Sequence, residues 1–411
     1  MIKRSCRSCG AQLEITFVDL GVTPLANAFV TAEALGRPEI FYPLHAYVCS
    51  ECFLVQLEEF ESPQNIFSEY AYFSSFSETW LQHAQAYARE MIKRFHLGPK
   101  SQVIEVASND GYLLQFFHQE TIPVLGIEPA ANIAEAAIGR GIPTIVKFFG
   151  EETAKELVLQ GHQADLLVAN NVLAHVPNLN DFIQGLRVIL KSEGVITLEF
   201  PHLLRMIEEC QFDTIYHEHF SYFSFLTINR IFNSRRMRIF DVEQIPTHGG
   251  SLRVYACHSD SLENPVSNRC GLLLDRERAR GLDSLKTYRS FEQRVRQTKR
   301  DFLRFLIEAK TERKIIAGYG APAKGNTLLV YCGVRTDFVE FTVDKSPHKQ
   351  GLYLPGTLIP IKDPQELRRA RPDYVVILPW NLKDEIMEQI AFIRGWGGKF
   401  VVPIPSVAIY D

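Results

Sequence analysis

The sequence predicts an α/β protein in three parts: a small metal-binding unit at the N-terminus, followed by two α/β domains. Short, continuously apolar runs alternate with helix-like segments between residues 103 and 198 and again between 314 and 402. Such alternation is typical of parallel strands covered by helices on both faces. Residues 1–75 show no long helical period and contain two close pairs of cysteines. We therefore divide the 411 residues into domains at 1–75, 76–260 and 261–411.

Composition argues against two classes of partner. The formal net charge is -4, so bulk electrostatics gives no case for binding nucleic acid or an anionic membrane. The first residues lack the apolar stretch of a signal peptide, and no run of about 18 apolar residues occurs to span a membrane. We expect a cytoplasmic protein, a monomer or small homo-oligomer, without a nucleic-acid or membrane partner.

Four of the eight cysteines form two pairs, Cys6/Cys9 and Cys49/Cys52, each with two residues between its members. The thiolates of each pair can reach one ion, and two pairs complete a tetrahedral all-thiolate shell. Such a closed shell leaves no position for water, so we predict a structural zinc site. Two redox dithiols, or buried thiols without a ligand, remain alternatives because a long stretch of chain separates the pairs.

The first α/β domain opens with a helix from about residue 77 to 98. Strands are expected at residues 103–106, 124–127, 166–169 and 195–198, with helices at 132–140 and 179–190. Ligands of such sheets bind beyond the carboxyl ends of the strands. The loop after the first strand has small residues that let the backbone approach a nucleoside, although Ala107 and Asn109 replace the usual glycines. Glu128 ends the second strand, where a carboxylate can accept hydrogen bonds from ribose hydroxyls.

Together these residues resemble the class I S-adenosylmethionine methyltransferases, so the resemblance implies a Rossmann-like methyltransferase domain. It implies that the first loop holds the methionine part of the cofactor and that Glu128 holds the ribose. The strand and loop at residues 165–175 would supply contacts on the adenine and substrate sides. The cofactor-binding residues implied are Glu105, Ala107, Asn109, Gly111, Glu128, Asn170 and Asn171.

Residues 213–222 form the densest group of titratable side chains in the chain. If this segment is extended, His217 and His219 share one face and Glu218 faces the other, whereas a helix gives a different geometry. A histidine with a pKa near 6.5 can serve as a general base at neutral pH. The two histidines could instead ligate a catalytic metal, or be structural parts of an aromatic wall.

This segment brings a more specific resemblance, to the sugar 3-C-methyltransferases. It rests on the four cysteines, residues 105–111, the Tyr-His-Glu-His segment, residues 247–253 and a Gly-Tyr-Gly-Ala-Pro-Ala-Lys-Gly loop. The resemblance implies methylation of C-3 in a nucleotide-linked 4-keto deoxysugar, for example a dTDP-linked one. By this similarity His219 is the general base, and the other catalytic-site residues are Tyr216, Glu218, His175 and Tyr70.

The implied chemistry suits these residue types. Methylating a carbon requires a carbanion, and the 4-keto group acidifies the neighbouring C-3 proton. An imidazole can remove that proton, and donors such as Tyr216 or His175 can stabilise the enolate oxygen. A methyltransferase acting on C, N or O of another carbonyl-containing metabolite is the alternative enzyme. A zinc-anchored binding or scaffold protein is the alternative outside enzymes.

The pattern of residues 261–411 predicts a second Rossmann-like α/β domain. A long helix spans about 285–309, and strands are expected at 314–318, 338–343, 374–378 and 399–402. The small-residue loop after the first of these strands, with Lys324, could hold a phosphate at a helix N-terminus. The resembled family implies that this half helps hold the nucleotide-sugar, and we assign substrate binding to His248, Gly249, Tyr319, Lys324 and Asn326. A second cofactor such as NAD, or a scaffold role, remains an alternative.

Overall fold

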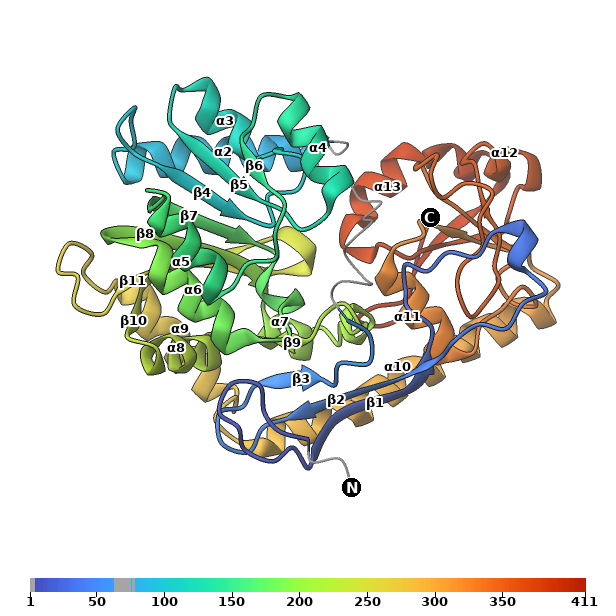
Figure 1. The fold of residues 1–411 in the computed structure, drawn as a ribbon. Coiled ribbons are helices and arrows are strands. Elements are labelled where there is room, and N and C mark those ends of the chain that lie inside the picture. The colour runs from blue at the N-terminus through green and yellow to red at the C-terminus, as the bar shows by residue number, and fades with distance from the viewer. Residues whose placement is uncertain (1–3, 63–74, 76–77) are drawn as a thin grey trace.

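The computed structural model describes residues 4–62, 75 and 78–411. It confirms the α/β class, with one small antiparallel sheet and two larger sheets in which most neighbouring strands are parallel. In Figure 1 the two larger units stand side by side above the N-terminal sheet. Helix α10 (Leu285–Thr311) runs beneath this arrangement. The domain boundaries after residues 75 and 260 stay predictions.

The small sheet joins the N-terminal unit to its neighbours. Its strands β1 (Ile15–Thr23), β2 (Tyr42–Val48) and β3 (Val55–Leu57) are antiparallel, and the short helix η1 (Ala32–Ala34) lies between the first two. The fourth strand, β9 (Ser221–Tyr222), comes from a distant part of the chain and pairs with β3. None of these strands was predicted from the sequence.

The central sheet has the strand order β10-β11-β8-β7-β4-β5-β6. Its strands are β4 (Val103–Val106), β5 (Val124–Ile127), β6 (Thr144–Ile145), β7 (Ala164–Asn170), β8 (Leu190–Pro201), β10 (Met237–Ile245) and β11 (Ser251–His258). Its α-helices are α2 (Glu78–Arg94), α3 (Leu114–Gln119), α4 (Ala131–Gly139), α5 (Glu151–Leu159), α6 (Leu179–Ile189), α7 (Leu203–Glu208), α8 (Phe225–Ser234) and α9 (Asn268–Ala279). Three short 3-10 turns are η3 (Leu173–His175), η4 (Phe212–Thr214) and η5 (Thr247–Gly249).

The four predicted strands and two predicted helices of this sheet are confirmed. Helix α2 also forms as its apolar spacing predicts, because Ala84, Ala88 and Met91 fall on one face and are buried. These four strands run parallel to one another, as expected, and the antiparallel part of the sheet comes from β10 and β11, which were not among the predicted strands. Strand β11 is antiparallel to both β8 and β10. The reason is local: β10 and β11 form a hairpin through residues 246–250, and strands joined by so short a connection must be antiparallel.

The C-terminal sheet has the order β14-β13-β12-β15-β16-β17. Its strands are β12 (Ile316–Tyr319), β13 (Phe341–Val343), β14 (Ile361–Lys362), β15 (Tyr374–Ile377), β16 (Lys399–Val402) and β17 (Ala408–Tyr410). Its helices are α11 (Ala323–Cys332), α12 (Glu366–Ala370), η6 (Trp380–Leu382), α13 (Lys383–Gln389) and η7 (Ala391–Trp396). The first five strands of the sheet run parallel and β17 is antiparallel to β16, so the predicted second Rossmann-like unit is present.

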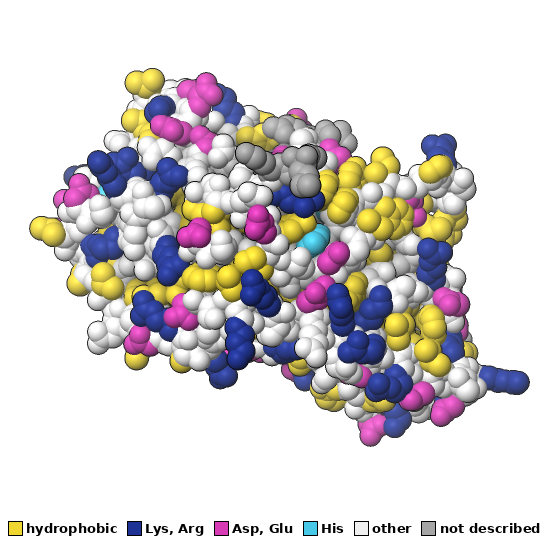
Figure 2. Space-filling view, turned by 90° about the horizontal axis from the view of Figure 1, so that it is seen from below, with side chains coloured by type: hydrophobic (Ala, Val, Ile, Leu, Met, Phe, Trp, Pro, Cys, Tyr) yellow, Lys and Arg dark blue, Asp and Glu magenta, His cyan; other side chains and the backbone are white. Residues whose placement is uncertain are grey.

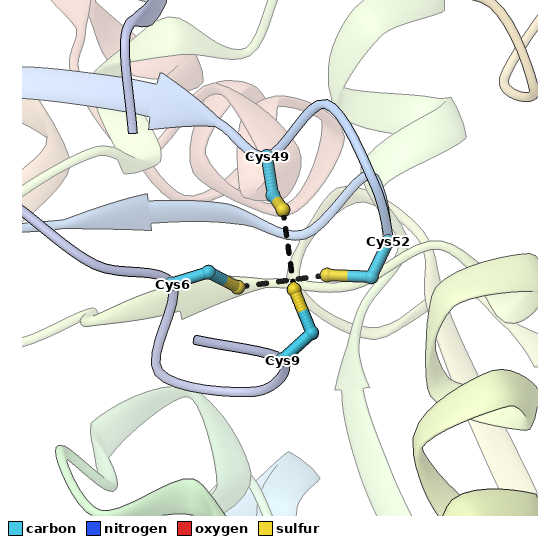
Figure 3. A group of neighbouring side chains, drawn as sticks. All are labelled: Cys6, Cys9, Cys49 and Cys52. Carbon is cyan, nitrogen blue, oxygen red and sulfur yellow. Dashed lines mark hydrogen bonds between the residues drawn. The ribbon is translucent and has the colours of Figure 1, made fainter. Parts of the chain in front are cut away.

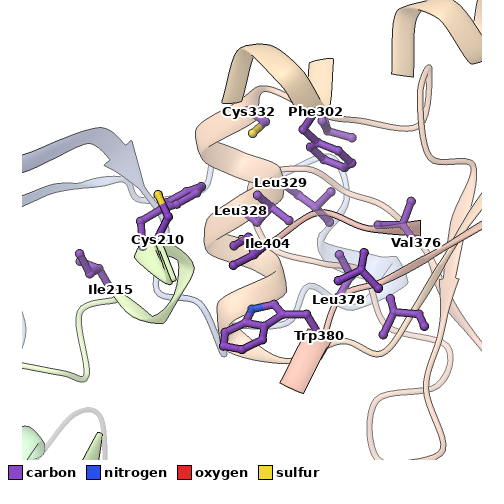
Figure 4. Packing of buried hydrophobic residues seen from close by; sticks show 14 of the residues in the cluster. Cys210, Ile215, Phe302, Leu328, Leu329, Cys332, Val376, Leu378, Trp380 and Ile404 are labelled. Atoms are coloured by element: carbon purple, nitrogen blue, oxygen red, sulfur yellow. The ribbon is translucent and has the colours of Figure 1, made fainter. Parts of the chain in front are cut away.

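One hydrophobic core runs through all three parts. It joins Leu44 of β2, Ile215 after η4 and Leu328 of α11, all completely buried. Figure 4 shows where the last two regions meet, with Cys210 and Ile215 on one side and helix α11 and Trp380 of the C-terminal unit on the other. Because a close-packed interior transmits displacement, this shared core holds the three parts in a defined relation.

Charges on the surface are mixed. Several basic residues of α10 pair with acids, as in Arg296–Glu292 at 2.9 Å and Lys310–Glu340 at 2.8 Å. Figure 2 shows basic and acidic side chains interspersed over the face seen from below. Within the described ranges, no helix combines the length and the apolar character that a membrane crossing requires.

Candidate active site and metal centre

The four predicted metal ligands come together at the edge of the N-terminal sheet. The sulfur atoms of Cys6, Cys9, Cys49 and Cys52 lie within 4.8 Å of one another, from two loops that face each other (Figure 3). The Sγ–Sγ distances are 3.5 Å for Cys6–Cys52 and for Cys9–Cys49. Four thiolates about 2.3 Å from one zinc ion lie at similar separations, so this donor set fits tetrahedral zinc.

The surroundings of the cysteines also favour a metal. Gln56 donates from Nε2 to the Cys6 sulfur at 3.2 Å, a contact of the kind that orients a metal-bound thiolate. Hydrogen bonds from Cys49 and then Cys52 lower the pKa of the Cys6 thiol. In the part of the chain that the structure describes, no other group of His, Cys, Asp and Glu is close enough to hold an ion. Among these described residues, His217 and His219 do not form a three-ligand group.

The predicted cofactor loop follows β4 and has an unusual backbone. Ala107, Asn109 and Gly111 all adopt positive φ, at 53°, 50° and 76°. For the alanine this conformation costs free energy, and such strain is typical of ligand-binding loops. Glu128 braces the loop, because its carboxylate accepts hydrogen bonds from the amides of Asn109 at 3.0 Å and Ala130 at 2.9 Å. The carboxylate thus ties the end of β5 to the loop after β4.

Buried polar atoms at this edge of the sheet lack partners within the described residues. They are Glu105 Oε2, Ser108 Oγ, Asp110 Oδ1, Asn170 Oδ1 and Asn171 Nδ2. All follow or end β4 and β7, at the carboxyl side where ligands of such sheets bind. Burial, and then the nearby carboxylates of Glu128 and Asp110, raises the pKa of Glu105 well above its usual value. Unsatisfied donors and acceptors beside three acids fit a polar ligand that carries positive charge.

The His-rich segment forms a turn, so neither the extended nor the helical alternative describes it. The Tyr216 carbonyl accepts from the amide of His219 at 2.9 Å, and this closes the turn. His217 points away from His219 and contacts the carbonyl of Pro43 from Nε2 at 3.1 Å. The carboxylate of Glu218 is buried and accepts from Nδ2 of Asn27 at 2.6 Å, and burial raises its pKa.

His219 is held in one tautomer. Its Nδ1 lies 3.0 Å from the Thr214 carbonyl, which can only accept, so Nδ1 carries the proton. In the neutral ring Nε2 is then an acceptor, and the hydroxyl of Tyr216 donates to it at 2.9 Å. Burial, and then the nearby His175, lowers the pKa of His219 well below its usual value. The imidazole is therefore neutral at pH 7 and able to accept a proton at Nε2.

His175 stands beside this pair, at the end of η3. Its ring meets that of His219 edge-on at a centroid distance of 4.7 Å, and its Nδ1 donates to the Glu218 carbonyl at 2.8 Å. Burial lowers the pKa of His175 to about 4. The structure thus brings together three of the predicted catalytic residues: Tyr216, His175 and His219. Tyr70 lies outside the described residues, and its role stays a prediction.

Two sequence comparisons show which family the chain belongs to. A family model described as a C-methyltransferase C-terminal domain matches residues 246–405, a zinc binding domain model matches 6–67, and a methyltransferase domain model matches 80–235. C-methyltransferase NovU of Streptomyces niveus is 34% identical over 404 residues, which cover 98% of this chain and 95% of the relative. The chain belongs to the C-methyltransferase family.

Two solved structures each resemble part of this C-methyltransferase. Magnesium protoporphyrin IX methyltransferase of Synechocystis PCC 6803 with bound SAM is 14% identical, with a TM-score of 0.34 over 44% of this chain and 79% of that one. The PH0226 protein of Pyrococcus horikoshii OT3 is 13% identical, with a TM-score of 0.38 over 48% of this chain and 99% of that one. At such scores these likenesses carry no argument about this protein.

The C-terminal unit of this C-methyltransferase contributes a lysine to the same region. Lys324 of α11 donates to Oδ1 of Asn381 at 2.8 Å, and its ammonium lies 4.6 Å from the centre of the Trp380 ring. Burial lowers the pKa of Lys324, while the nearby carboxylate of Asp213 raises it. Lys324 and His248 lower the pKa of His219, so these groups lie close enough to interact electrostatically.

The other predicted substrate residues lie in different surroundings. His248 is exposed and has a φ of 55°, at the turn between β10 and β11. Gly249 follows with positive φ, and a Cβ there would come within 2.5 Å of the Trp380 ring. Tyr319 is buried and donates from its hydroxyl to Gln389 at 3.1 Å. Asn326 is buried in α11, and its Oδ1 has no partner among the described residues.

Sequence reasoning missed two tryptophans of the site. Trp380 follows β15 and donates from Nε1 to the buried carboxylate of Asp213 at 2.7 Å. Trp80 of α2 stacks on Tyr112, which follows the cofactor loop, and lies 5.4 Å from the His248 ring. The signal for Trp380 was available, because it follows the carboxyl end of a predicted parallel strand. Trp80 lies within a predicted helix, where an aromatic residue more often belongs to the core.

Proposed function

We propose that this C-methyltransferase uses S-adenosylmethionine to methylate C-3 of a nucleotide-linked 4-keto deoxysugar, for example a dTDP-linked one, through an enolate. The observation that carries the proposal is the neutral His219 imidazole, whose Nε2 faces the Tyr216 hydroxyl beside the carboxyl end of the sheet. A carbon atom attacks a methyl donor only as a nucleophile. A base that removes a proton next to a carbonyl group creates that nucleophile.

The polar edge of the central sheet supports S-adenosylmethionine as the donor. Its ammonium and sulfonium groups are cationic, which suits the three acids Glu105, Asp110 and Glu128. The strained loop brings backbone close to the ligand, and Asn170 and Asn171 present unpartnered polar atoms. When bound, the donor supplies an electrophilic methyl group on sulfur, and the carbon nucleophile accepts it.

His219 serves as the proton acceptor in this proposal. Nε2 takes the C-3 proton, and the electron pair of the broken C–H bond moves into the enolate. The Tyr216 hydroxyl, which occupies Nε2 before the substrate binds, turns to donate to the enolate oxygen. His175 lies beside the His219 ring, and its one N–H is held by the Glu218 carbonyl, so it positions the site while Tyr216 is the donor. Preorganised donors of this kind typically supply much of the stabilisation of an enolate-like transition state.

The substrate would enter between the central and C-terminal units. Lys324 supports an anionic substrate there. Its half-buried side chain contacts the Asn381 amide and the Trp380 ring, and the nearby Asp213 carboxylate raises its pKa. A diphosphate or a developing enolate would complement this charge. His248, Gly249, Tyr319 and Asn326 remain proposed substrate residues, and Glu218 and Tyr70 remain proposed catalytic-site residues. The cytoplasmic location and the assembly as a monomer or small homo-oligomer also stay predictions.

Proton exchange in deuterated water tests the proposal. Incubation with S-adenosylmethionine and a dTDP-4-keto deoxysugar should yield a C-3-methylated product. With S-adenosylhomocysteine in place of the donor, deuterium should appear at C-3. His219→Gln should abolish both, whereas the surface variant His118→Gln should keep both. Turnover without exchange, or exchange that survives in His219→Gln, would refute the base assignment. Methylation of a different carbonyl compound with no activity on 4-keto sugars would refute the substrate class.

A further inference from the structure

The cysteine loop of the zinc centre contacts the segment that carries His219, and Arg7 makes this contact. Arg7 lies between the ligands Cys6 and Cys9. Its guanidinium donates from Nη2 to the Leu57 carbonyl at 2.6 Å and lies 5.4 Å from the centre of the Phe220 ring. Phe220 directly follows His219 in the chain and is 1% exposed. One side chain thus spans from the metal loop to the residue next to the proposed base.

The backbone of Phe220 is bound on both sides. Its carbonyl accepts from the amide of Leu57 at 3.0 Å, and its own amide donates to the Ala174 carbonyl at 2.7 Å. Leu57 belongs to β3, so the first bond reaches the zinc unit. Ala174 precedes His175, so the second reaches the other histidine of the site. The positions of the His219 and His175 imidazoles therefore depend on the position of Phe220.

Strand β3 carries this link to the second cysteine pair. It begins soon after Cys52, and its Val55 and Gln56 pair with Tyr222 and Ser221 of β9. The side chain of Gln56 accepts from the amide of Arg7 at 3.0 Å and donates to the Cys6 sulfur at 3.2 Å. An ion bound to both cysteine pairs would fix the spacing between Arg7 and β3.

The unsatisfied donors of Arg7 also indicate that this side chain does more than stabilise the fold. Its Nε and Nη1 are buried and find no partner in the described part of the chain, although burial of such groups costs free energy. Arginine is a demanding choice for this position if only stability matters. Its planar group reaches the Leu57 carbonyl and covers the Phe220 ring at once, which a shorter or unbranched side chain does not do.

We propose that Arg7 is a positioning residue, through which the zinc-bound cysteine loop seats Phe220 and aligns His219 and His175. The inference rests on the proposed role of His219 as the base. It assigns to the zinc centre a part in active-site geometry as well as in folding. Misplacement of a catalytic group by about 1 Å can cost roughly 100-fold in rate, so loss of this support should be visible in kcat.

The test compares Arg7→Met, Arg7→Lys and the control Arg4→Met. Arg4 is exposed, pairs with Glu58 and lies over the Tyr47 ring, so its contacts in the strand region are with residues other than Phe220. Zinc content is measured for each variant. NMR spectra of histidine-labelled protein then give the signals of the His219 imidazole, which are assigned by their absence in His219→Gln. We expect Arg7→Met to keep its zinc, shift the His219 signals and lower kcat by about tenfold or more, with KM changed by less than about threefold.

Arg7→Lys should restore part of the rate, and Arg4→Met should match the wild type. Removal of zinc from the wild type by a chelator should shift the same His219 signals. A zinc-loaded Arg7→Met protein with wild-type His219 signals and kcat would overturn the proposal. Unchanged His219 signals in folded, zinc-free protein would do the same. A wild type that is inactive on 4-keto sugars would refute the proposed function. The NMR measurement needs no substrate, so it would still test whether Arg7 positions His219.

Discussion

Tyr216 and His219 meet twice within a single turn. The Tyr216 carbonyl accepts from the His219 amide at 2.9 Å, and the Tyr216 hydroxyl reaches the His219 ring at Nε2, also at 2.9 Å. The backbone bond sets the two side chains on the same side of the turn, and the Thr214 carbonyl fixes which ring nitrogen is protonated. A phenol and a neutral imidazole are thereby paired before any substrate arrives.

The first prediction follows from this pair. Tyr216→Phe removes the hydroxyl that we assign to the enolate oxygen, and loss of one such donor typically costs about 100- to 1,000-fold in kcat. Binding of S-adenosylhomocysteine, measured by calorimetry, should be unchanged. Tyr374→Phe, in the C-terminal sheet, is the matched control and should keep wild-type kcat. A Tyr216→Phe enzyme with full kcat would contradict the assignment of the hydroxyl.

The second prediction concerns pH. Burial and the neighbouring His175 hold the pKa of His219 below 6.5, so the ring loses its proton early as the pH rises and stays neutral at pH 7. Activity that needs the neutral ring should therefore persist below pH 6.5 and fall only as the pH drops through the lowered pKa. Steady-state kcat measured over pH about 5 to 8 tests this.

The pH experiment needs a control for the titration of Asp213. Burial raises its pKa to about 6, so its titration could also produce an acidic limb. Asp213→Asn removes this group while an amide oxygen can still accept from Trp380. The limb that belongs to His219 should remain in this variant. A limb centred at or above pH 6.5 in Asp213→Asn would show that burial does not govern the base.

Much of the fold was predictable because its signals are local. The strand before Ala107 and the helix after Asn178 are short apolar or periodic segments, and their bounds follow from neighbouring residues. The cysteine pairs were predictable for the same reason, since each pair spans only four positions in the sequence. The pairing of β3 with β9 was not, because those strands are far apart in the chain and β9 is too short to show a pattern.

The sequence was enough to predict which residues belong to the site, but not how their side chains contact one another. His219 and His175 were both named, but their edge-on contact depends on the Phe220 amide reaching Ala174. The turn at residues 216–219 has no glycine, proline or asparagine to signal it. Trp380 was missed because its contacts, Asp213 and Gly249, belong to another part of the chain.

The third prediction addresses the donor site. Glu105→Gln removes a buried carboxyl whose charged form is disfavoured by burial and by two neighbouring acids. Without ligand the variant should be more stable and unfold at a higher Tm. Its affinity for S-adenosylmethionine should fall, because the cationic ligand loses an acidic partner. Glu135→Gln, on the exposed side of α4, should change neither property. Equal affinity in Glu105→Gln and wild type would place the donor elsewhere.

The fourth prediction concerns the metal. Wild-type protein should release one zinc ion per chain on denaturation, measured by mass spectrometry of the metal. Cys49→Ala should lose the ion and unfold at lower temperature, since structural zinc contributes about 10–16 kcal/mol to the folding of small zinc-finger peptides. Cys270→Ala removes a buried cysteine from α9 that lies outside the cluster, and it should keep the zinc. Zinc retained at full occupancy in Cys49→Ala would contradict the four-cysteine shell.

The fifth prediction separates substrate binding from donor binding. Lys324→Met removes the ammonium beside Trp380 and Asn381, and a hydrogen bond to a charged group is worth about 1.5–3 kcal/mol. KM for the nucleotide-sugar should therefore rise by roughly 10- to 150-fold, with affinity for S-adenosylhomocysteine unchanged. Lys383→Met, on α13 at the surface, is the control and should behave as wild type. If kcat falls while KM stays constant, Lys324 acts on the enolate in the transition state and not on the bound nucleotide, because only an interaction absent from the ground state changes kcat alone.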